Sequence, residues 1–200
     1  MTQVKICGFM TPDDITAVNV AHPDFVGFVF APGRHQIAPQ TARHLKSLLQ
    51  SSIKTVGVFV GESITDILEI YKTGSIDIAQ LHRPITSTEI KQLQRAGLKV
   101  IQVFEQRPID SQSPADYLMA DSGKGSGRLL SLNDVPHPKR PFILAGGLNP
   151  NNVQQAIQTV QPTIVDVSSG VETNQKKDIQ KIIQFVKHAK EETYNENFIK

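Results

Sequence analysis

Residues 142–150 read FILAGGLNP and residues 164–170 read IVDVSSG. Each stretch is a short run of apolar residues that passes into glycine or serine within a few positions. Runs of this length and character are typical of buried parallel strands. Glycine after a strand lets backbone N–H groups approach an anion without interference from a Cβ atom. The two strand ends therefore predict a site for a phosphate group.

The same kind of run recurs along the chain, and helix candidates stand between most of the runs. The eight strand candidates are residues 4–7, 25–30, 55–60, 76–81, 99–104, 117–121, 142–145 and 164–167. The helix candidates are recognised by capping residues or prolines at their starts. They begin after Thr11, Pro39, Ser63, Ser87 and Asn149–Pro150, and a last helix is expected over residues 178–192. This alternation requires parallel strands joined by right-handed crossovers.

We therefore predict an α/β fold: a single, compact (β/α)8 TIM barrel over residues 1–200. The segments after the fifth and sixth strands are too short or too irregular for full helices, so we expect degenerate helices there. An open, doubly wound sheet has the same periodicity, but the polar residues gathered at several strand ends favour the barrel. Residues 194–200 are expected to form a frayed tail.

The composition limits the classes of function. Of the 200 residues, 39% are hydrophobic and 20% are charged, and the net charge is only +2, which favours a globular protein without nucleic acid or membrane partners. No apolar run reaches the roughly 20 residues that a membrane span needs. A single cysteine excludes an intramolecular disulfide and favours the cytoplasm. We expect a small-molecule partner.

Strand parity predicts which polar side chains face one another, because successive side chains point to opposite faces of a strand. Val4 and Ile6 are expected to face the helices, which turns Lys5 and Cys7 into the barrel. The same alternation points five further side chains inward near strand ends: Gln80, His82, Asp121, Asp166 and Ser168. A thiol, an imidazole and carboxylates therefore converge on one mouth of the barrel.

The glycine-rich ends of the seventh and eighth strands lie where barrels of this kind commonly hold a phosphate. The predicted phosphate-binding residues are Gly146, Gly147, Ser168, Ser169 and Gly170. A helix that begins at Asn149–Pro150 would also direct the positive end of its dipole toward the phosphate. The expected ligand is a sugar phosphate or a similar monoester, and simple turn chemistry is the alternative reading of the glycine pair.

Six segments resemble, in order, the phosphoribosylanthranilate isomerase family of tryptophan biosynthesis. They are KICG at 5–8, GFVFA at 27–31, VGVFV at 56–60, QLH at 80–82, AGGLNPNNV at 145–153 and VDVSSGVE at 165–172. The resemblance covers residues 4 to about 186. It implies an Amadori rearrangement of N-(5-phosphoribosyl)anthranilate, with no metal and no organic cofactor.

By motif position, the resemblance makes Cys7 the general base that removes a proton from the sugar C2 and Asp121 the general acid that assists ring opening. A thiol is a competent base if its pKa of about 8.5 is lowered toward neutrality. Lys5 is one source of positive charge for this. Asp121 must instead hold a proton near pH 7, as burial or a neighbouring phosphate would encourage.

The loop after Phe30 departs from the family, which usually has Ser-x-Arg there with the arginine expected to engage the substrate. Here His35 stands at the arginine's position and Arg34 stands one residue earlier. Either residue is a candidate for binding the substrate, and we favour Arg34 because a guanidinium keeps its charge at any working pH. The family's glycine-rich loop after Asp121 is also shortened here.

Two further candidates for binding the substrate have alternative interpretations. His82 is either a neighbour of the substrate or a hydrogen-bonded core histidine. Asp166 either orients a substrate hydroxyl or pairs with Lys5 inside the barrel. The run Lys176–Lys177 is expected to be a solvated entry to the last helix.

Three alternatives to this function stay open. Cys7 would serve only as a small buried hydrophobe in a non-catalytic, phosphosugar-binding paralogue, but such a protein has no need for an acid and a base. A related sugar-phosphate isomerase of the histidine pathway would end its first strand in aspartate. A pentose-phosphate epimerase would need histidine and aspartate ligands for a metal. The sequence allows either a monomer or a homodimer.

Overall fold

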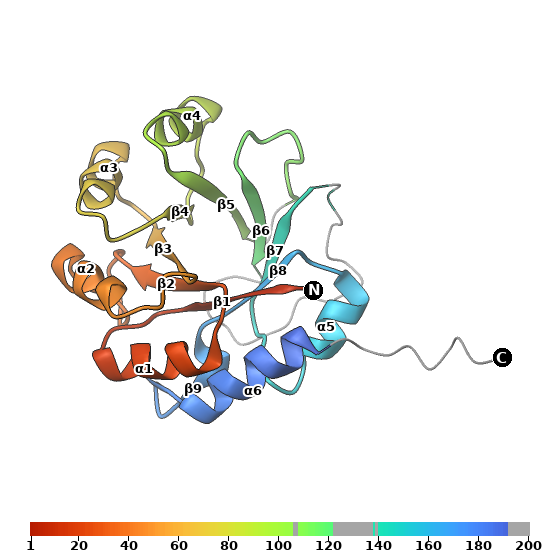
Figure 1. Ribbon diagram of the computed structural model, residues 1–200. Helices are drawn as coiled ribbons and strands as arrows, with labels where there is room; N and C mark the ends of the chain where they lie inside the picture. The colour runs from red at the N-terminus through yellow and green to blue at the C-terminus, as the bar shows by residue number, and fades with distance from the viewer. Residues whose placement is uncertain (106–107, 122–137, 139, 192–200) are drawn as a thin grey trace.

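Eight parallel strands form a closed barrel in the computed structural model, which describes residues 1–105, 108–121, 138 and 140–191 (Figure 1). The strands pair in chain order, and the eighth closes against the first. They are β1 (Gln3–Cys7), β2 (Phe25–Val29), β3 (Lys54–Phe59), β4 (Ile78–Leu81), β5 (Lys99–Glu105), β6 (Tyr117–Asp121), β7 (Phe142–Ala145) and β8 (Ile164–Val167). The predicted barrel is confirmed.

Six described helices surround the strands in Figure 1. They are α1 (Pro12–Ala21), α2 (Pro39–Ser47), α3 (Ile64–Lys72), α4 (Ser87–Arg95), α5 (Val153–Val160) and α6 (Ile179–Lys190). The predicted cap at Ser87 was wrong by one residue. Thr86 caps α4, because its hydroxyl accepts from the Glu89 N–H while the Glu89 carboxylate accepts from the Thr86 N–H.

The connection from β5 to β6 contains no helix in its described part, residues 108–116, as predicted for a degenerate segment. Its backbone carbonyl groups need other donors. The Arg140 guanidinium, just before β7, supplies them by donating to the carbonyl oxygens of Ser113 and Ala115. Residues 122–137 and 139 of the connection after β6, and the predicted tail over 194–200, lie outside the described residues.

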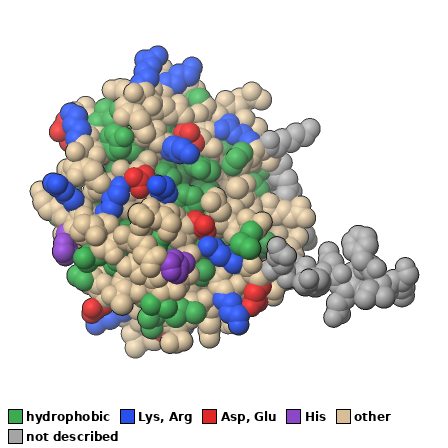
Figure 2. All heavy atoms as spheres, in the orientation of Figure 1, with side chains coloured by type: hydrophobic (Ala, Val, Ile, Leu, Met, Phe, Trp, Pro, Cys, Tyr) green, Lys and Arg blue, Asp and Glu red, His purple; other side chains and the backbone are tan. Residues whose placement is uncertain are grey.

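Two apolar layers separate the inside of the barrel from its outside. The inner layer consists of Phe25, Val56, Ile78, Ile101, Val103, Met119, Ile143, Ala145 and Ile164. The outer layer lies between strands and helices and includes Val4 and Ile6, so Lys5 and Cys7 point inward as strand parity predicts. None of the described helices is long and apolar enough to cross a membrane. Figure 2 shows Lys and Arg scattered among Asp and Glu on the visible face.

Aspartates at the amino ends of the strands hold neighbouring strands together. Asp24, Asp77 and Asp116 each stand just before an even-numbered strand. Their Oδ2 atoms accept hydrogen bonds of 2.8, 2.8 and 2.9 Å from backbone N–H groups of the preceding odd-numbered strand, those of Val4, Thr55 and Val100. This face of the barrel is therefore built for stability, and the opposite face is left for the site.

Asp77 also pairs with Lys46, whose Nζ lies 2.7 Å from Oδ1. Partial burial opposes the charge of Asp77, but the hydrogen bonds from Lys46 and Thr55 outweigh it and lower the pKa of this carboxyl. A lowered pKa contributes stability that is present above the unfolded value, about 3.9, and lost as pH falls through the folded value.

We expect Asp77→Asn to reduce the free energy of unfolding by about 1–2 kcal/mol at pH 7, measured by urea denaturation. The difference from wild type should shrink as pH falls below about 4, where the Asp77 carboxyl of the unfolded chain binds a proton, and vanish below the lowered pKa of the folded protein. Glu69→Gln removes an exposed pair with Lys72 and should cost under about 0.5 kcal/mol. Equal stability of wild type and Asp77→Asn at pH 7 would show that the carboxylate contributes nothing.

Candidate active site

A cavity of about 360 Å³ opens at the carboxyl ends of the strands. All the predicted site residues line it: Cys7, Arg34, His35, His82, Asp121, Gly146, Gly147, Asp166, Ser168, Ser169 and Gly170. The cavity also reaches Gln80 and Glu105. The structure therefore brings together side chains that the sequence spreads over more than 160 positions.

Cys7 ends β1 with its side chain buried in the barrel mouth. A Cβ atom on Gly27 of β2 would lie 2.5 Å from the Cys7 Sγ, so glycine is needed there to leave room for the thiol. Gly8 follows with φ +89°, in the region that favours glycine, and its N–H donates to the Gly27 carbonyl oxygen over 2.9 Å. The strand thus ends directly after Cys7 and leaves the thiol at the cavity.

Lys5 and Asp166 form a buried ion pair below the thiol, with Nζ and Oδ1 2.8 Å apart. Burial opposes the charge of Lys5, but Asp166 and Cys7 outweigh it and raise the pKa of the ammonium. Asp166 also lines the cavity. Both interpretations of Asp166 therefore stay compatible with its position: it pairs with Lys5 and it borders the space for a ligand.

The pKa of Cys7 is raised, whereas a general base was expected to need a pKa lowered toward neutrality. Burial raises the pKa of the thiol, and the Asp166 carboxylate adds to this rise. Lys5 and Lys177 lower the pKa, as expected of positive charges, but they do not outweigh burial. The thiol therefore holds its proton at about pH 7, and the two ammonium groups reduce the cost of ionising it.

Glycines shape the two loops predicted to hold a phosphate. Gly146 and Gly147 have φ values of +93° and +68°, where any other residue would be strained. A Cβ atom on Gly170 would lie 1.9 Å from the carbonyl oxygen of Leu148, so the loops after β7 and β8 touch at this glycine. This contact makes the two loops one continuous backbone surface beside the cavity.

The helix after the glycine pair begins later than predicted, at Val153 rather than Asn151. Asparagine side chains hold a turn in the intervening residues. The Asn149 N–H donates to the Asn152 Oδ1 over 2.8 Å, and the Asn152 Nδ2 donates to the Gly147 carbonyl oxygen over 3.0 Å. After β8, Ser169–Val171 form a 3₁₀ turn, η2, at the matching position.

His82 follows β4 and stands in a chain of polar side chains on the wall of the cavity. Its Nδ1 lies 2.9 Å from the Glu105 Oε1, and its Nε2 lies 2.7 Å from the Gln80 Nε2. Because the carboxylate accepts the Nδ1 proton, a neutral ring accepts at Nε2 from the Gln80 amide. His82 is thus hydrogen-bonded and also borders the cavity.

Glu105 is a cavity residue that sequence reasoning missed. The predicted fifth strand stopped at Phe104, whereas β5 extends to Glu105. Strand parity could have identified Glu105 as an inward-facing residue, because it shares a face with Ile101 and Val103 of the inner layer.

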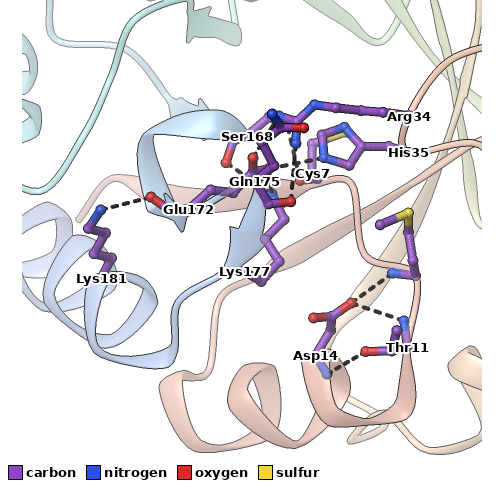
Figure 3. A network of polar contacts seen from close by, with 11 residues as sticks. Cys7, Thr11, Asp14, Arg34, His35, Ser168, Glu172, Gln175, Lys177 and Lys181 are labelled. Carbon is purple, nitrogen blue, oxygen red and sulfur yellow. Dashed lines mark hydrogen bonds and ion pairs between the residues drawn. The ribbon is translucent and has the colours of Figure 1, made fainter.

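Arg34 and His35 both meet Glu172 in Figure 3. The Arg34 Nη2 lies 2.6 Å from the Glu172 Oε2, and the His35 Nε2 lies 3.0 Å from the Oε1. Lys177 joins them 2.8 Å from the same Oε1, with only 4% of its side chain exposed. The expectation of a solvated Lys177 was wrong: β9 (Glu172–Thr173) and β10 (Lys176–Lys177) form an antiparallel hairpin that pairs Lys177 with Glu172.

We expect Gly170→Ala to weaken binding of inorganic phosphate by at least about tenfold, because the loops after β7 and β8 must separate to admit the methyl group. Isothermal titration calorimetry measures the affinity, and circular dichroism checks the fold. Gly61→Ala is the matched control, since no atom lies within 4 Å of its added Cβ. Unchanged phosphate affinity in folded Gly170→Ala would contradict the role of this contact.

A closed barrel with a thiol, carboxylates and glycine-rich loops around one mouth defines the class of (β/α)8-barrel proteins with a candidate phosphate site. The family model for N-(5'-phosphoribosyl)anthranilate (PRA) isomerase matches residues 4–188. The chain belongs to this family and is an isomerase of tryptophan biosynthesis, which confirms the predicted family and enzyme class.

Named relatives are similar to this chain over nearly its whole length. The N-(5'-phosphoribosyl)anthranilate isomerase of Lacticaseibacillus paracasei is 64% identical over 98% of this chain and 99% of its own. A phosphoribosylanthranilate isomerase in complex with reduced 1-(o-carboxyphenylamino)-1-deoxyribulose 5-phosphate is 31% identical, with a TM-score of 0.82 over 95% of this chain and 99% of its own. Monomers of the dimeric enzyme from Thermotoga maritima are 30% identical, with a TM-score of 0.82 and the same coverage.

Proposed function

We propose that the cavity converts N-(5-phosphoribosyl)anthranilate into 1-(2-carboxyphenylamino)-1-deoxyribulose 5-phosphate, with Cys7 as general base and Asp121 as general acid. One observation carries the proposal: the Cys7 thiol and the Asp121 carboxylate border the same cavity as the glycine-rich loops after β7 and β8. The relative solved with a reduced form of this product supports the choice of ligand.

In the first step, the phosphate binds to the backbone of Gly146, Gly147 and Ser168–Gly170, which fixes the sugar over the mouth. Asp121 gives its proton to the ring oxygen while the bond from that oxygen to C1 breaks. The anilino nitrogen supplies the electrons and forms a Schiff base at C1. The Asp121 carboxylate is left ionised.

In the second step, Cys7 acts as the thiolate, after its own proton has passed to solvent, and takes the proton from C2. The electrons of that C–H bond pass toward the Schiff-base nitrogen. The resulting enolamine becomes the aminoketose when C1 gains the proton held by Cys7 and the C2 hydroxyl returns a proton to the Asp121 carboxylate, which leaves a C2 carbonyl and restores the acid and the base. The positive charges of Lys5 and Lys177 stabilise the thiolate, in agreement with their lowering of the Cys7 pKa.

The remaining side chains of the cavity are proposed to bind the substrate. A guanidinium has five N–H donors, and Arg34 uses one for Glu172 and one for the carbonyl oxygen of Gln175. The others are available to the carboxylate of anthranilate. His82 and Asp166 border the space where the sugar hydroxyls lie, and His35 contributes to the same wall as Arg34.

Several properties stay predictions. These are the single domain over residues 1–200, the cytoplasmic location, and catalysis without metal or organic cofactor. Both a monomer and a homodimer remain compatible with the chain.

We expect Cys7→Ser and Asp121→Asn each to lower kcat/KM by at least about 100-fold, because each removes a proton-transferring group. The decay of anthranilate fluorescence with freshly generated substrate measures turnover. Asp13→Asn, the same chemical change at an exposed carboxylate of α1, should leave turnover unchanged. A wild-type protein that binds the reduced product without turning over substrate would instead support the non-catalytic phosphosugar-binding alternative.

Lys5→Met is expected to shift the rise of kcat with pH to higher pH. The Lys5 charge lowers the pKa of Cys7, so its loss raises that pKa and leaves less thiolate at a given pH. The buried Asp166 loses its partner, so the protein should also lose about 3–5 kcal/mol of stability. Lys72→Met, at an exposed pair, serves as control. An unchanged pH profile of kcat would remove Lys5 from the mechanism.

A further inference from the structure

Glu172 gathers three positively charged or titratable side chains beside the cavity. Its carboxylate, with 5% of the side chain exposed, meets Arg34, His35 and Lys177 at 2.6–3.0 Å. Its backbone carbonyl oxygen accepts from the Lys181 Nζ over 2.7 Å. In Figure 3, Arg34 and His35 reach Glu172 from the loop after β2, Lys177 reaches it from the β9–β10 hairpin, and Lys181 reaches its backbone from α6. Among the described residues, Glu172 is not one of those that line the cavity.

Arg34 depends on this carboxylate for its position. Its side chain is 43% exposed, so packing alone leaves the guanidinium many orientations. Glu172 holds Nη2, and the carbonyl oxygen of Gln175 accepts from Nη1 over 3.2 Å. The guanidinium is thereby pre-organised at the rim of the cavity, which reduces the entropy lost when a ligand binds.

His35 is held between Glu172 and the end of β1. A Cβ atom on Gly8 would lie 3.1 Å from the imidazole ring, so the ring packs directly against this glycine. Burial and the charges of Lys177 and Arg34 lower the pKa of His35, and Glu172 only partly offsets them. The neutral ring therefore donates its Nε2 proton to Glu172, which fixes both its tautomer and its orientation.

Lys177 connects Glu172 to the loop after β8. Its Nζ also donates to the Ser168 carbonyl oxygen over 2.9 Å, and the Ser168 hydroxyl donates to the carbonyl oxygen of Cys7 over 3.2 Å. The Glu172 charge neutralises one of the two permanent positive charges that it contacts. The cluster keeps a net positive charge beside the loops proposed to hold phosphate.

We propose that Glu172 is a positioning residue for the rearrangement, which holds Arg34 and His35 over the cavity without touching the substrate. This inference rests on the proposed function, because its readout is binding of the phosphoribosylanthranilate. The alternative is a carboxylate that only stabilises the β9–β10 hairpin. The two roles differ in what they change: positioning changes affinity for the substrate, whereas hairpin stability changes unfolding alone.

Glu172→Gln tests the proposal, because glutamine keeps the length and one oxygen but loses the charge. We expect KM to rise about tenfold while kcat stays within about twofold, the pattern of binding lost equally from the ground state and the transition state. Glu172→Asp keeps the charge on a shorter side chain and should lose less affinity than Glu172→Gln. In an Arg34→Ala background, Glu172→Gln should raise KM less than it does with Arg34 present, because only its hold on His35 is left to lose.

Lys181→Met is the matched control, since it removes a contact with the Glu172 backbone and leaves the carboxylate in place. It should lower the Tm without changing KM. The proposal is overturned if Glu172→Gln lowers the Tm with KM unchanged, or if its effect on KM is the same with and without Arg34.

The Kd of the reduced product, 1-(o-carboxyphenylamino)-1-deoxyribulose 5-phosphate, separates this inference from the proposed function. A wild-type protein without turnover contradicts the proposed function alone. The Kd values of wild type, Glu172→Gln, Glu172→Asp and Lys181→Met still test Glu172 in that case. If Glu172→Gln does not fold, Glu172→Asp decides: weaker binding with an unchanged Tm supports positioning, and unchanged binding refutes it.

Discussion

Closure of the barrel between β1 and β8 is the constraint on which the site depends. The register places Lys5 opposite Asp166, and these side chains form a buried ion pair. Burying two charges carries a desolvation penalty, so the pair is stable only with good geometry, and loss of one partner leaves a costly unpaired charge. The same register places the Ser168 hydroxyl on the carbonyl oxygen of Cys7. A shift of one residue would reverse every inward side chain of the strand.

Two electrostatic effects act in opposite directions on the Cys7 thiol at the mouth of the barrel. Burial keeps the Cys7 thiol protonated, while Lys5 and Lys177 favour its ionised form. The cations are held in turn by Asp166 and Glu172. Each ammonium therefore keeps a defined place beside the thiol.

Glycine provides the shape of the site at positions where a methyl group would not fit. Gly27 leaves room for the Cys7 thiol, and Gly170 allows the loop after β8 to touch the carbonyl oxygen of Leu148. Gly8 lets the chain turn away directly after the thiol and gives the His35 ring a flat surface. The shape of the cavity thus depends on the absence of a side chain at these glycines as well as on the side chains that line it.

The sequence by itself determined the barrel and the predicted residues around the cavity, and it placed most strand and helix boundaries within two residues of those observed. Strand parity and the glycines at strand ends are local patterns, so Cys7, Asp121 and Gly146 were predicted from their immediate neighbours. Glu105 was missed because the predicted strand ended one residue early, although its parity was readable. Only the tertiary structure decided the contacts of Glu172 with Arg34, His35 and Lys177, and with them the burial of Lys177. The physical reason is that the contacts of Arg34 and His35 join a loop to a hairpin nearly 140 positions away, and no local periodicity records which distant charge a side chain will meet. The contact of Lys177 needs the hairpin itself, which was not predicted.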